Sequence, residues 1–531
     1  MALCALVAAC GNRGAVTFDI TSPTNTLYDP VAPPATVSEY DIRTATGSLI
    51  GIASAVQGSG DSNGGRLPLG ALMPSDAPVD VYVTALSGGN LLGEARIRDV
   101  SIQSGKTRKY EADIRKPLIF VGSTLPPEMT AGNALDKVQI LDPNASVDLA
   151  AGSGQRAISG MTAGAVSWDG RFLFVANGTA LGAFDTGSGT SVSGSLTLPF
   201  APSRLGVAPR DQALVALDPG MSGLGIISNV AGLEATPAQA MVKTVSLGQQ
   251  VGRAIAFSPD GQKMYVLTGG ATIDPCSPGT TAPANAIVVV GIDGTVGGTF
   301  TLPGFVSDIT VDPATGTLVL ADATSGQIAT LDLASASPGS VAPAVLLGGV
   351  TCPSAVRVVD GVVFAVTSTR DTTQANAFVL QRVTLSSGAS TALSFTGPTY
   401  PIPISSMAST NGDIQTVNIP VRPVSIEAYE LAMTPDGNRA EFATRAHYIE
   451  SGTKFTFSQE PCIVDLDIVE YGLYAVDVRT GNASYTSRSQ LVQSGPTACI
   501  DCAPGTIDEE QGDCPPSAGD RPAGLAAAFG P

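Results

Sequence analysis

The chain has 531 residues and a formal net charge of −18, with 46 Asp and Glu against 28 Lys and Arg. This acidic balance argues against nucleic acid or an anionic lipid surface as a partner, because both would repel the chain. Charged residues make up only 14% of the sequence and hydrophobic residues 44%, with 60 Gly and 38 Pro. The composition predicts turn-rich globular domains rather than long disorder, and the length allows several of them.

Residues 1–14 form a short apolar run of small residues with a cysteine near its end. Val7-Ala8-Ala9-Cys10 resembles a bacterial lipobox. The resemblance implies lipidation of Cys10 and an extracytoplasmic protein anchored in the cell envelope, with residues 1–14 as signal and tether. The alternative is a buried first strand. No other stretch is apolar for long enough to span a bilayer, so we expect membrane contact through the lipid alone.

Residues 15–116 contain short apolar or alternating runs separated by Gly, Ser and Asp. Alternation with period two predicts half-buried strands. The expected strands are Val16–Ile20, Val37–Arg43, Leu49–Val56, Val79–Leu86, Leu91–Arg98 and Thr107–Ile114. Strands of this number and length predict a small β-sandwich, similar to the immunoglobulin-like or transthyretin-like modules of bacterial surface proteins.

From residue 117 a phrase recurs, in which an apolar run is followed by an Asp-Gly-like turn and a second apolar run. The clearest copy is Ala254–Thr268, and others are Ala165–Asn177 and Glu430–Thr444. Asp-Gly supplies the positive-φ corner of a tight hairpin. The spacing of the turns suits a propeller blade of four strands. The second strands are expected at Leu118–Ser123, Arg171–Asn177, Gln212–Asp218, Lys263–Thr268, Thr317–Asp322, Val362–Ser368 and Arg439–Thr444.

The phrase Ser258-Pro259-Asp260-Gly261, with Tyr265–Thr268 after it, resembles the YVTN-type family of bacterial β-propeller repeats. The resemblance implies an all-β fold and says little about function. We expect a sandwich over 15–116, a propeller of seven blades over 117–495 and a flexible, cysteine-containing tail over 496–531. The first repeat lacks an obvious first strand, so six or eight blades remain as alternatives.

The long insertions share one face of the expected propeller. If strands a to d run outward from the axis, the a–b turns are the short Asp-Gly corners, and the b–c and d–a connections lie on the opposite face. The long connections there are 122–134, 269–285, 396–424 and 446–461. Loops gathered on one end of a rigid scaffold often carry function, although insertions also accumulate where they are tolerated.

Six cysteines remain once Cys4 and Cys10 are assigned to the signal. They are Cys276, Cys352, Cys462, Cys499, Cys502 and Cys514. An even number suits disulfides in an oxidising compartment. The placement of the loops predicts Cys276–Cys352, a link from Cys462 to the tail, and Cys502–Cys514. Cys499-Ile500-Asp501-Cys502 is also a Cys-x-x-Cys motif, for which zinc binding and redox chemistry are the alternatives.

The sequence offers little for catalysis. With His447 as the only histidine, a His-rich metal centre is excluded, and a Ser-His-Asp triad would have to use this residue. Trp168 is the only tryptophan, which disfavours the quinone-dependent propeller dehydrogenases with a tryptophan motif in each blade. We therefore expect no cofactor and no metal.

The leading hypothesis is a non-enzymatic envelope lipoprotein that binds a protein or glycan partner at the loop-rich face. Its candidate contact residues are Tyr400, His447, Tyr448, Phe455 and Phe457. A lactonase-like hydrolase is the first alternative, and it would need carboxylates at the axis, such as Asp308 and Glu430. A structural subunit of an envelope assembly, marked by an apolar patch on the outer blade edges, is the second.

Overall fold

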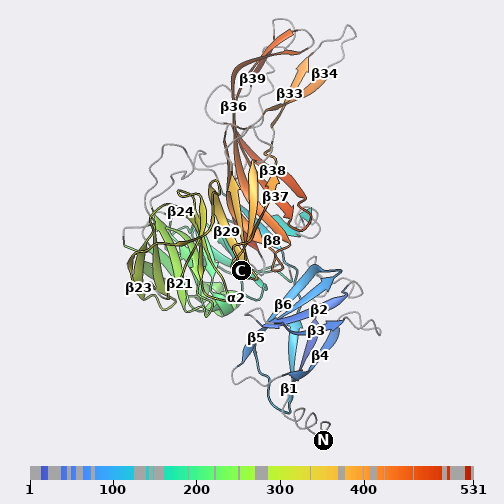
Figure 1. The fold of residues 1–531 in the computed structure, drawn as a ribbon, viewed down its shortest axis with the longest axis vertical. Helices are drawn as coiled ribbons and strands as arrows, with labels where there is room; N and C mark the ends of the chain where they lie inside the picture. The colour runs from blue at the N-terminus through green and yellow to red at the C-terminus, as the bar shows by residue number, and fades with distance from the viewer. Residues whose placement is uncertain are drawn as a thin grey trace.

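The fold consists of a small sandwich, a ring of sheets and two hairpins that project from the ring (Figure 1). It is taken from a computed structural model. The structure describes residues 14–21, 37–44, 49–54, 64–72, 78–124, 139–142, 147–148, 161–188, 190–219, 223–248, 251–269, 285–334, 336–368, 377–398, 400–406, 415–421, 423, 425–457, 460–492, 499–502 and 521–527. Residues 1–13, and with them the predicted lipobox and Cys10, lie outside this set.

The N-terminal part is a sandwich of two sheets, with strand orders β4-β1-β7 and β3-β2-β5-β6. Alternate residues of β2 and β5 are buried, as their sequence predicts, and Phe18, Ile42 and Val83 are fully enclosed between the sheets. The strands are β1 (Gly14–Thr21), β2 (Glu39–Thr44), β3 (Leu49–Ser54), β4 (Gly64–Leu72), β5 (Val79–Ser87), β6 (Asn90–Val100) and β7 (Thr107–Asp113).

Strand β4 was not anticipated from the sequence, which there reads Gly-Gly-Arg-Leu-Pro-Leu-Gly-Ala-Leu. Gly and Pro are typical of turns, and Pro68 cannot donate a backbone hydrogen bond. The strand forms nevertheless because it lies at a sheet edge and pairs only with β1, so Pro68 interrupts no central ladder.

Seven further sheets of four or five strands follow among the described residues, besides the two-stranded sheet β33-β34 given below. Each sheet is given from its inner strand outward. The first sheet is β40 (Arg521–Ala527), β8 (Ile119–Thr124), β9 (Gln139–Asp142) and β10 (Val147–Asp148); the second is β11 (Ala163–Val166), β12 (Phe172–Asn177) and β13 (Ala180–Asp185), where β13 pairs with both β14 (Thr190–Ser191) and β15 (Leu196–Thr197); the third is β16 (Arg204–Val207), β17 (Leu214–Leu217), β18 (Gly223–Ile227) and β19 (Lys243–Ser246); the fourth is β20 (Val251–Phe257), β21 (Lys263–Gly269), β22 (Ala286–Gly291), β23 (Val296–Thr301) and β27 (Gly339–Ser340). The fifth sheet is β24 (Val306–Val311), β25 (Leu318–Asp322), β26 (Gln327–Leu331) and β28 (Ala344–Gly348); the sixth is β29 (Pro353–Val359), β30 (Val362–Ser368), β31 (Phe378–Thr384) and β32 (Ser390–Phe395); the seventh is β35 (Ser425–Met433), β36 (Arg439–Phe457), β37 (Glu460–Asp477) and β38 (Ala483–Val492).

The remaining elements are short helices and added strands. They are η2 (Pro209–Asp211), α2 (Val230–Ala235), η3 (Pro237–Gln239), β33 (Tyr400–Ser406), β34 (Gln415–Val421) and β39 (Cys499–Cys502). Among the described residues, no helix is long and apolar enough to cross a membrane.

The inner strands close into a ring in the order β40, β11, β16, β20, β24, β29, β35 and back to β40, each in contact with the next. This arrangement is a β-propeller, and the count of seven blades stays a prediction. The ring is closed by the C-terminal strand β40, which pairs antiparallel with β8. The prediction of a flexible tail over 496–531 was therefore wrong for β39 and β40. The strand missing from the first repeat is supplied from the far end of the chain.

The recurrent phrase forms the a–b corners. In the fourth sheet the Ser258 hydroxyl donates to Asp260 Oδ1 at 2.6 Å and accepts the Lys263 amide at 2.9 Å, while Gly261 has φ +69°. Thr434 and Asp436 repeat the pattern in the last sheet, with a hydroxyl-to-carboxylate distance of 2.6 Å. A side chain other than glycine at the positive-φ corner would be strained. The repeat is thus turn chemistry that holds each blade together.

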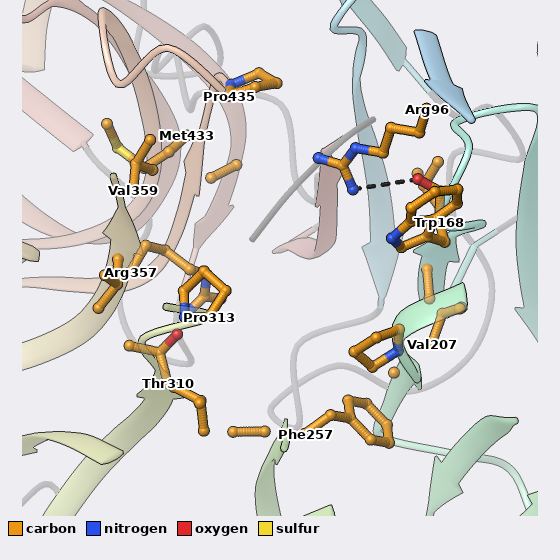
Figure 2. Close-up of a pocket in the computed structure, with 18 of the residues that line it drawn as sticks. Arg96, Trp168, Val207, Phe257, Thr310, Pro313, Arg357, Val359, Met433 and Pro435 are labelled. Atoms are coloured by element: carbon orange, nitrogen blue, oxygen red, sulfur yellow. Dashed lines mark hydrogen bonds between the residues drawn. The ribbon is translucent and has the colours of Figure 1, made fainter. Parts of the chain in front are cut away.

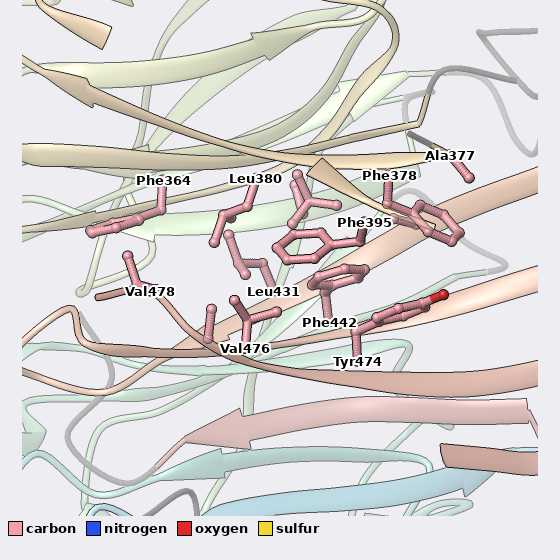
Figure 3. Packing of buried hydrophobic residues seen from close by; sticks show 14 of the residues in the cluster. Phe364, Ala377, Phe378, Leu380, Phe395, Leu431, Phe442, Tyr474, Val476 and Val478 are labelled. Atoms are coloured by element: carbon pink, nitrogen blue, oxygen red, sulfur yellow. The ribbon is translucent and has the colours of Figure 1, made fainter. Parts of the chain in front are cut away.

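The blades pack through apolar side chains between adjacent sheets. Between the last two sheets, Phe442 stacks on Tyr474 with ring centroids 5.0 Å apart, and Phe378 packs against both rings (Figure 3). The Tyr474 hydroxyl donates to the Thr396 carbonyl at 2.7 Å, so this aromatic residue is buried without losing its hydrogen bond.

Two segments predicted as loops are β-hairpins, and both project from the ring (Figure 1). The connection 396–424 contains β33 and β34, which pair from Tyr400↔Val421 to Ser406↔Gln415. The connection 446–461 is the far end of β36 and β37, which stay paired out to Phe457↔Glu460. Strand β39 pairs with the outer half of β37 and makes this arm three-stranded.

Candidate functional site

The sandwich packs on the face of the ring that carries the a–b corners, whereas the two hairpins project on the other side (Figure 1). Arg96 of β6 donates from Nη1 to the Trp168 carbonyl at 3.2 Å, and Trp168 belongs to the a–b corner between β11 and β12. The ring centroids of Trp168 and Tyr82 lie 5.9 Å apart, and the two rings meet nearly edge to face, with an angle of 64° between their planes. The face that looks plain in the sequence is therefore covered by the N-terminal domain.

Ion pairs reinforce this contact at the corner between β16 and β17. Arg98 pairs with Asp211, and Arg210 pairs with Asp80 at 3.1 Å and also with Asp99. Asp211 also accepts the Trp168 amide at 2.6 Å, which ties two neighbouring corners of the ring together. The sandwich is thus held against the ring by aromatic and charged contacts at once.

A cavity of about 680 Å³ lies inside the ring beneath the sandwich. Figure 2 shows Arg96 and Trp168 on one side of it, facing Arg357, Val359 and Met433. Its walls are apolar side chains of the inner strands, namely Val166, Val207, Ile255, Phe257, Ile309, Val311 and Val358. A volume of this size suits a small organic molecule.

The floor of the cavity, at the end away from the sandwich, is charged. Arg204, Asp308 and Glu430 line the cavity, and each stands three residues before the last residue of its inner strand, so the three lie at one depth. Because the inner strands all run toward the a–b corners, equal spacing from the strand end places these side chains in one layer around the axis.

Both carboxylates of this layer are paired with arginines. Asp308 Oδ2 accepts Arg357 Nη1 at 2.8 Å and the Val356 amide at 3.1 Å. Glu430 Oε1 lies 3.5 Å from Arg204 Nη2, and this carboxylate raises the pKa of the Arg204 guanidinium. The acids predicted for a hydrolase do reach the axis, but in the structure they serve as partners of arginines.

A third arginine, Arg253 of β20, stands next to this layer, directly before the cavity-lining Ala254. Its guanidinium carbon lies 4.0 Å from the centroid of the Phe305 ring. Its Nη1 is buried and has no hydrogen-bond partner among the described residues. Burial, with a contribution from nearby Arg204, lowers the pKa of Arg253 to about 10, so the group stays charged at neutral pH.

A smaller cavity lies at the edge of the domain contact and gathers carboxyl groups. It is lined by Arg98, Asp169, Asp211 and Glu234 among others. Burial raises the pKa of Asp211 to about 6, and burial together with the charge of Asp211 raises the pKa of Glu234 to about 7. These groups therefore titrate within the physiological range.

The predicted contact residues have different fates in the structure. Tyr448 is fully buried and its hydroxyl donates to Glu470 Oε2 at 2.8 Å, so its assignment as a surface anchor was wrong. His447 is half-buried on β36, opposite Ser425 and Val469. The backbones of Tyr400, Phe455 and Phe457 lie in the projecting hairpins, and their side chains lie outside the described residues.

The cysteines are only partly described. Cys352 is disulfide-bonded, while its predicted partner Cys276 lies outside the described residues, as does Cys514. In the arm, the backbone register places Cys462 opposite Cys502 and Cys499 opposite Asp465. The register thus favours Cys502, rather than Cys499, as the tail partner of Cys462.

Sequence reasoning missed the arginines of the site, Arg96, Arg204, Arg253 and Arg357. A signal was present, because each of the last three interrupts an apolar inner strand directly before a repeat corner. These arginines could be assigned to the site only once it was known which strands face the axis of the ring. In the part of the chain that the structure describes, no group of three or more His, Cys, Asp or Glu residues is arranged to hold a metal ion.

The closed ring of inner strands around a capped cavity defines a β-propeller protein with an N-terminal β-sandwich. Neither a protein-family model nor a curated protein matches the sequence. Among solved structures, hydrazine synthase from Kuenenia stuttgartiensis is similar with 14% identity and a TM-score of 0.35, covering 62% of this chain and 95% of that one. At this level of likeness nothing about its activity is carried over to this chain.

Proposed function

We propose that the protein is a non-enzymatic binding or scaffold module of the bacterial cell envelope, which meets a protein or glycan partner through the hairpin-bearing face of its propeller. The observation that carries this proposal is the placement of the sandwich. It covers the corner face of the ring, which leaves the opposite face, with its two projecting hairpins, to meet a partner. Exposed extensions on a rigid scaffold are common sites of recognition.

The position of the N-terminal strand supports a lipid anchor at Cys10. Strand β1, which begins at Gly14, belongs to the sandwich at the opposite end of the molecule from the hairpins (Figure 1). A lipid a few residues before β1 would therefore set the sandwich between the membrane and the ring and point the hairpins outward. Replacing Cys10 with Ser should move the protein from the membrane fraction to the soluble fraction, and continued membrane association would contradict the anchor.

Shortening the arm tests the binding face. Ile449 and Asp467 are register partners, so replacing residues 450–466 with Asn-Gly removes the projecting part and closes the remaining ladder with a two-residue turn. We expect the full-length, lipidated protein to lose partners that copurify from cells expressing it naturally. Val345→Ser, at an exposed position of β28, is the control and should retain them. Equal recovery from both variants, with unchanged thermal melting, would contradict the role of the arm.

Neither alternative is favoured by a specific contact. The two axial acids are engaged by arginines, as described above, whereas a lactonase-like enzyme would need a carboxylate available to accept a proton or bind a metal. Among the described residues, the exposed large hydrophobic side chains are Met241, Val296 and Val345, spread over three successive blades. Single exposed residues of this kind are ordinary and do not mark an assembly interface.

A further inference from the structure

We propose that the cavity under the sandwich binds a small organic cation, with its ammonium group at Asp360 and Asp436 and its apolar body against the inner strands. This site is separate from the hairpin face and would hold a ligand even if that face bound nothing. Three features support the proposal: the ion pairing of the residues that line the cavity, the departure of one blade from the repeated corner, and the apolar walls.

The charged residues that line the cavity leave two carboxylates without a cation. Five arginines and seven carboxyl residues line it, and each arginine pairs with one of the carboxylates. The two arginines of the floor pair with its two acids, as described above. At the other end, Arg43 pairs with Asp41 at 3.2 Å, Arg96 with Glu94 at 2.7 Å and Arg210 with Asp80 at 3.1 Å. Asp360 and Asp436 are left over, and neither forms an ion pair with another described residue.

The two unpaired carboxylates lie close together beneath the sandwich. They belong to the a–b corners of adjacent blades, between β29 and β30 and between β35 and β36. Burial raises the pKa of Asp360, the nearby and already paired Arg43 lowers it, and the charge of Asp436 raises it. Asp436 itself accepts only neutral donors, the Thr434 hydroxyl at 2.6 Å and the Asn438 backbone and side-chain amides at 3.1 Å and 2.7 Å. A cation between the two carboxylates would offset their mutual repulsion.

Asp360 departs from the corner that the other blades repeat. At five other a–b corners, the cavity is lined by a ring-shaped side chain, that of Trp168, Pro209, Pro259, Pro313 and Pro435. The corner of the sixth blade is shortened to Asp360 and Gly361, because Val359 and Val362 are register partners. Its two residues have φ +48° and +71°, as in a two-residue hairpin turn. The sixth blade thus presents a carboxylate to the cavity where the other corners present a ring.

The surroundings of the two carboxylates suit an organic cation rather than a metal ion. Among the residues that the structure describes, no three or more His, Cys, Asp or Glu are arranged to hold a metal ion. The walls beside the two corners are apolar and include Val359, Leu431 and Met433. Figure 2 shows Val359 and Met433 on the same side of the cavity as Pro435, the residue before Asp436. A cation that carries a hydrocarbon body would therefore match both the carboxylates and the walls.

The floor of the cavity would not attract the ammonium group. Its two carboxylates, Asp308 and Glu430, are paired with Arg357 and Arg204. The positive charge of Arg253 stands beside them. A cation is therefore oriented with its charge toward the sandwich and its hydrocarbon toward the floor.

The test compares ligands that share one hydrocarbon body and differ in the head group. Binding of octylammonium, octanol and octanoate to the purified full-length protein is measured by isothermal titration calorimetry at about pH 7.5. We expect octylammonium to bind at least about tenfold more tightly than octanol, since a hydrogen bond to a charged group contributes roughly one to two powers of ten in affinity. Octanoate should bind more weakly than octanol. Equal affinities, a preference for octanoate, or no binding of octylammonium would overturn the proposal without any variant.

Asp360→Asn then locates the ammonium group. Asparagine before glycine suits a two-residue hairpin turn, so the variant removes the charge and keeps the corner. The preference for octylammonium over octanol should fall about fivefold or more, the equivalent of one hydrogen bond. Asp436→Asn in addition should bring the two affinities close to each other.

Asp260→Asn is the matched control. Asp260 is also a corner aspartate followed by glycine, but it does not line the cavity, so this variant should keep the preference for octylammonium. All variants are first compared with the unmodified protein by thermal melting. An unchanged head-group preference in Asp360→Asn or in the double variant would assign the cation to another site and overturn the proposal.

Discussion

Arg204 and Glu430 form an ion pair between strands that are not neighbours in the ring, with Nη2 and Oε1 3.5 Å apart. Arg204 belongs to β16, which adjoins β11 and β20, whereas Glu430 belongs to β35, which adjoins β29 and β40. The pair therefore spans the axis and links opposite parts of the ring.

The ion pair between Arg204 and Glu430 should matter for stability chiefly because removing one residue leaves the charge of the other without a partner. Glu430→Gln leaves the Arg204 guanidinium without its counter-charge in a partly enclosed site, and we expect a loss of about 1–3 kcal/mol in the free energy of unfolding. Replacing both residues with Met should cost less than the sum of Arg204→Met alone and Glu430→Met alone. Denaturant unfolding of the four proteins in a double-mutant cycle measures the coupling. Strictly additive changes would show that the pair is not energetically linked.

Ring closure should depend on β40. Deleting residues 521–531 removes the inner strand of the first sheet, which pairs with β8 and contacts β11 and β35. The loss of this ladder should cost on the order of 5 kcal/mol, at about 1 kcal/mol for each hydrogen bond. Deleting only residues 528–531, which follow the strand, is the control. Similar melting temperatures for the two truncated proteins would mean that β40 does not close the ring.

The free energy of unfolding should increase at mildly acidic pH, because two buried carboxyl groups near the domain contact bind protons more tightly in the native state. The native pKa values of Asp211 and Glu234, about 6 and about 7, lie above those of free carboxyl groups. Between about pH 4.5 and 7 the native state thus binds more protons than the unfolded state, and stability from these groups falls as pH rises through that window. Below this pH window, carboxylates with lowered pKa values, such as Asp260 and Asp477, have the opposite effect: they reduce the free energy of unfolding as the pH falls.

Melting temperature against pH, with and without Asp211→Asn and Glu234→Gln, measures this effect. The double variant should show a flatter profile between pH 5 and 7. Trp168 fluorescence adds a local signal, because the only tryptophan lies at the domain contact beside Tyr82 and Arg96. Identical pH profiles for the variant and the unmodified protein would contradict the assignment.

The arm should contain a disulfide between Cys462 and Cys502. Directly opposed residues of antiparallel strands bring their Cβ atoms to within reach of a disulfide after a small adjustment, and the register opposes these two cysteines. Mass spectrometry of an unreduced digest should find the Cys462–Cys502 peptide pair, and Cys352 joined to Cys276. A Cys499–Cys502 or Cys502–Cys514 link would show that the register of β39 does not set the pairing.

Much of the scaffold is predictable from local patterns. Apolar runs such as Lys263–Gly269 and Val362–Ser368, and the corners at Gly170 and Gly261, need only residues a few positions apart to form strands and turns. The axial acids Asp308 and Glu430 could also be named in advance, because they sit in first strands of repeats. Tyr448, by contrast, was misplaced because an aromatic residue in an apparent loop continues a strand into a buried core.

By itself, the sequence determined the all-β character, the sandwich before the ring and the repeated corner, since these follow from spacing and turn chemistry within short segments. Only the tertiary structure decided that β40 completes the first sheet, that the sandwich covers the corner face, and that Arg204, Arg253 and Arg357 meet around one axis. These relationships join residues from distant parts of the chain. They depend on how the blades close around the axis, and no local pattern of apolar and polar residues specifies that closure.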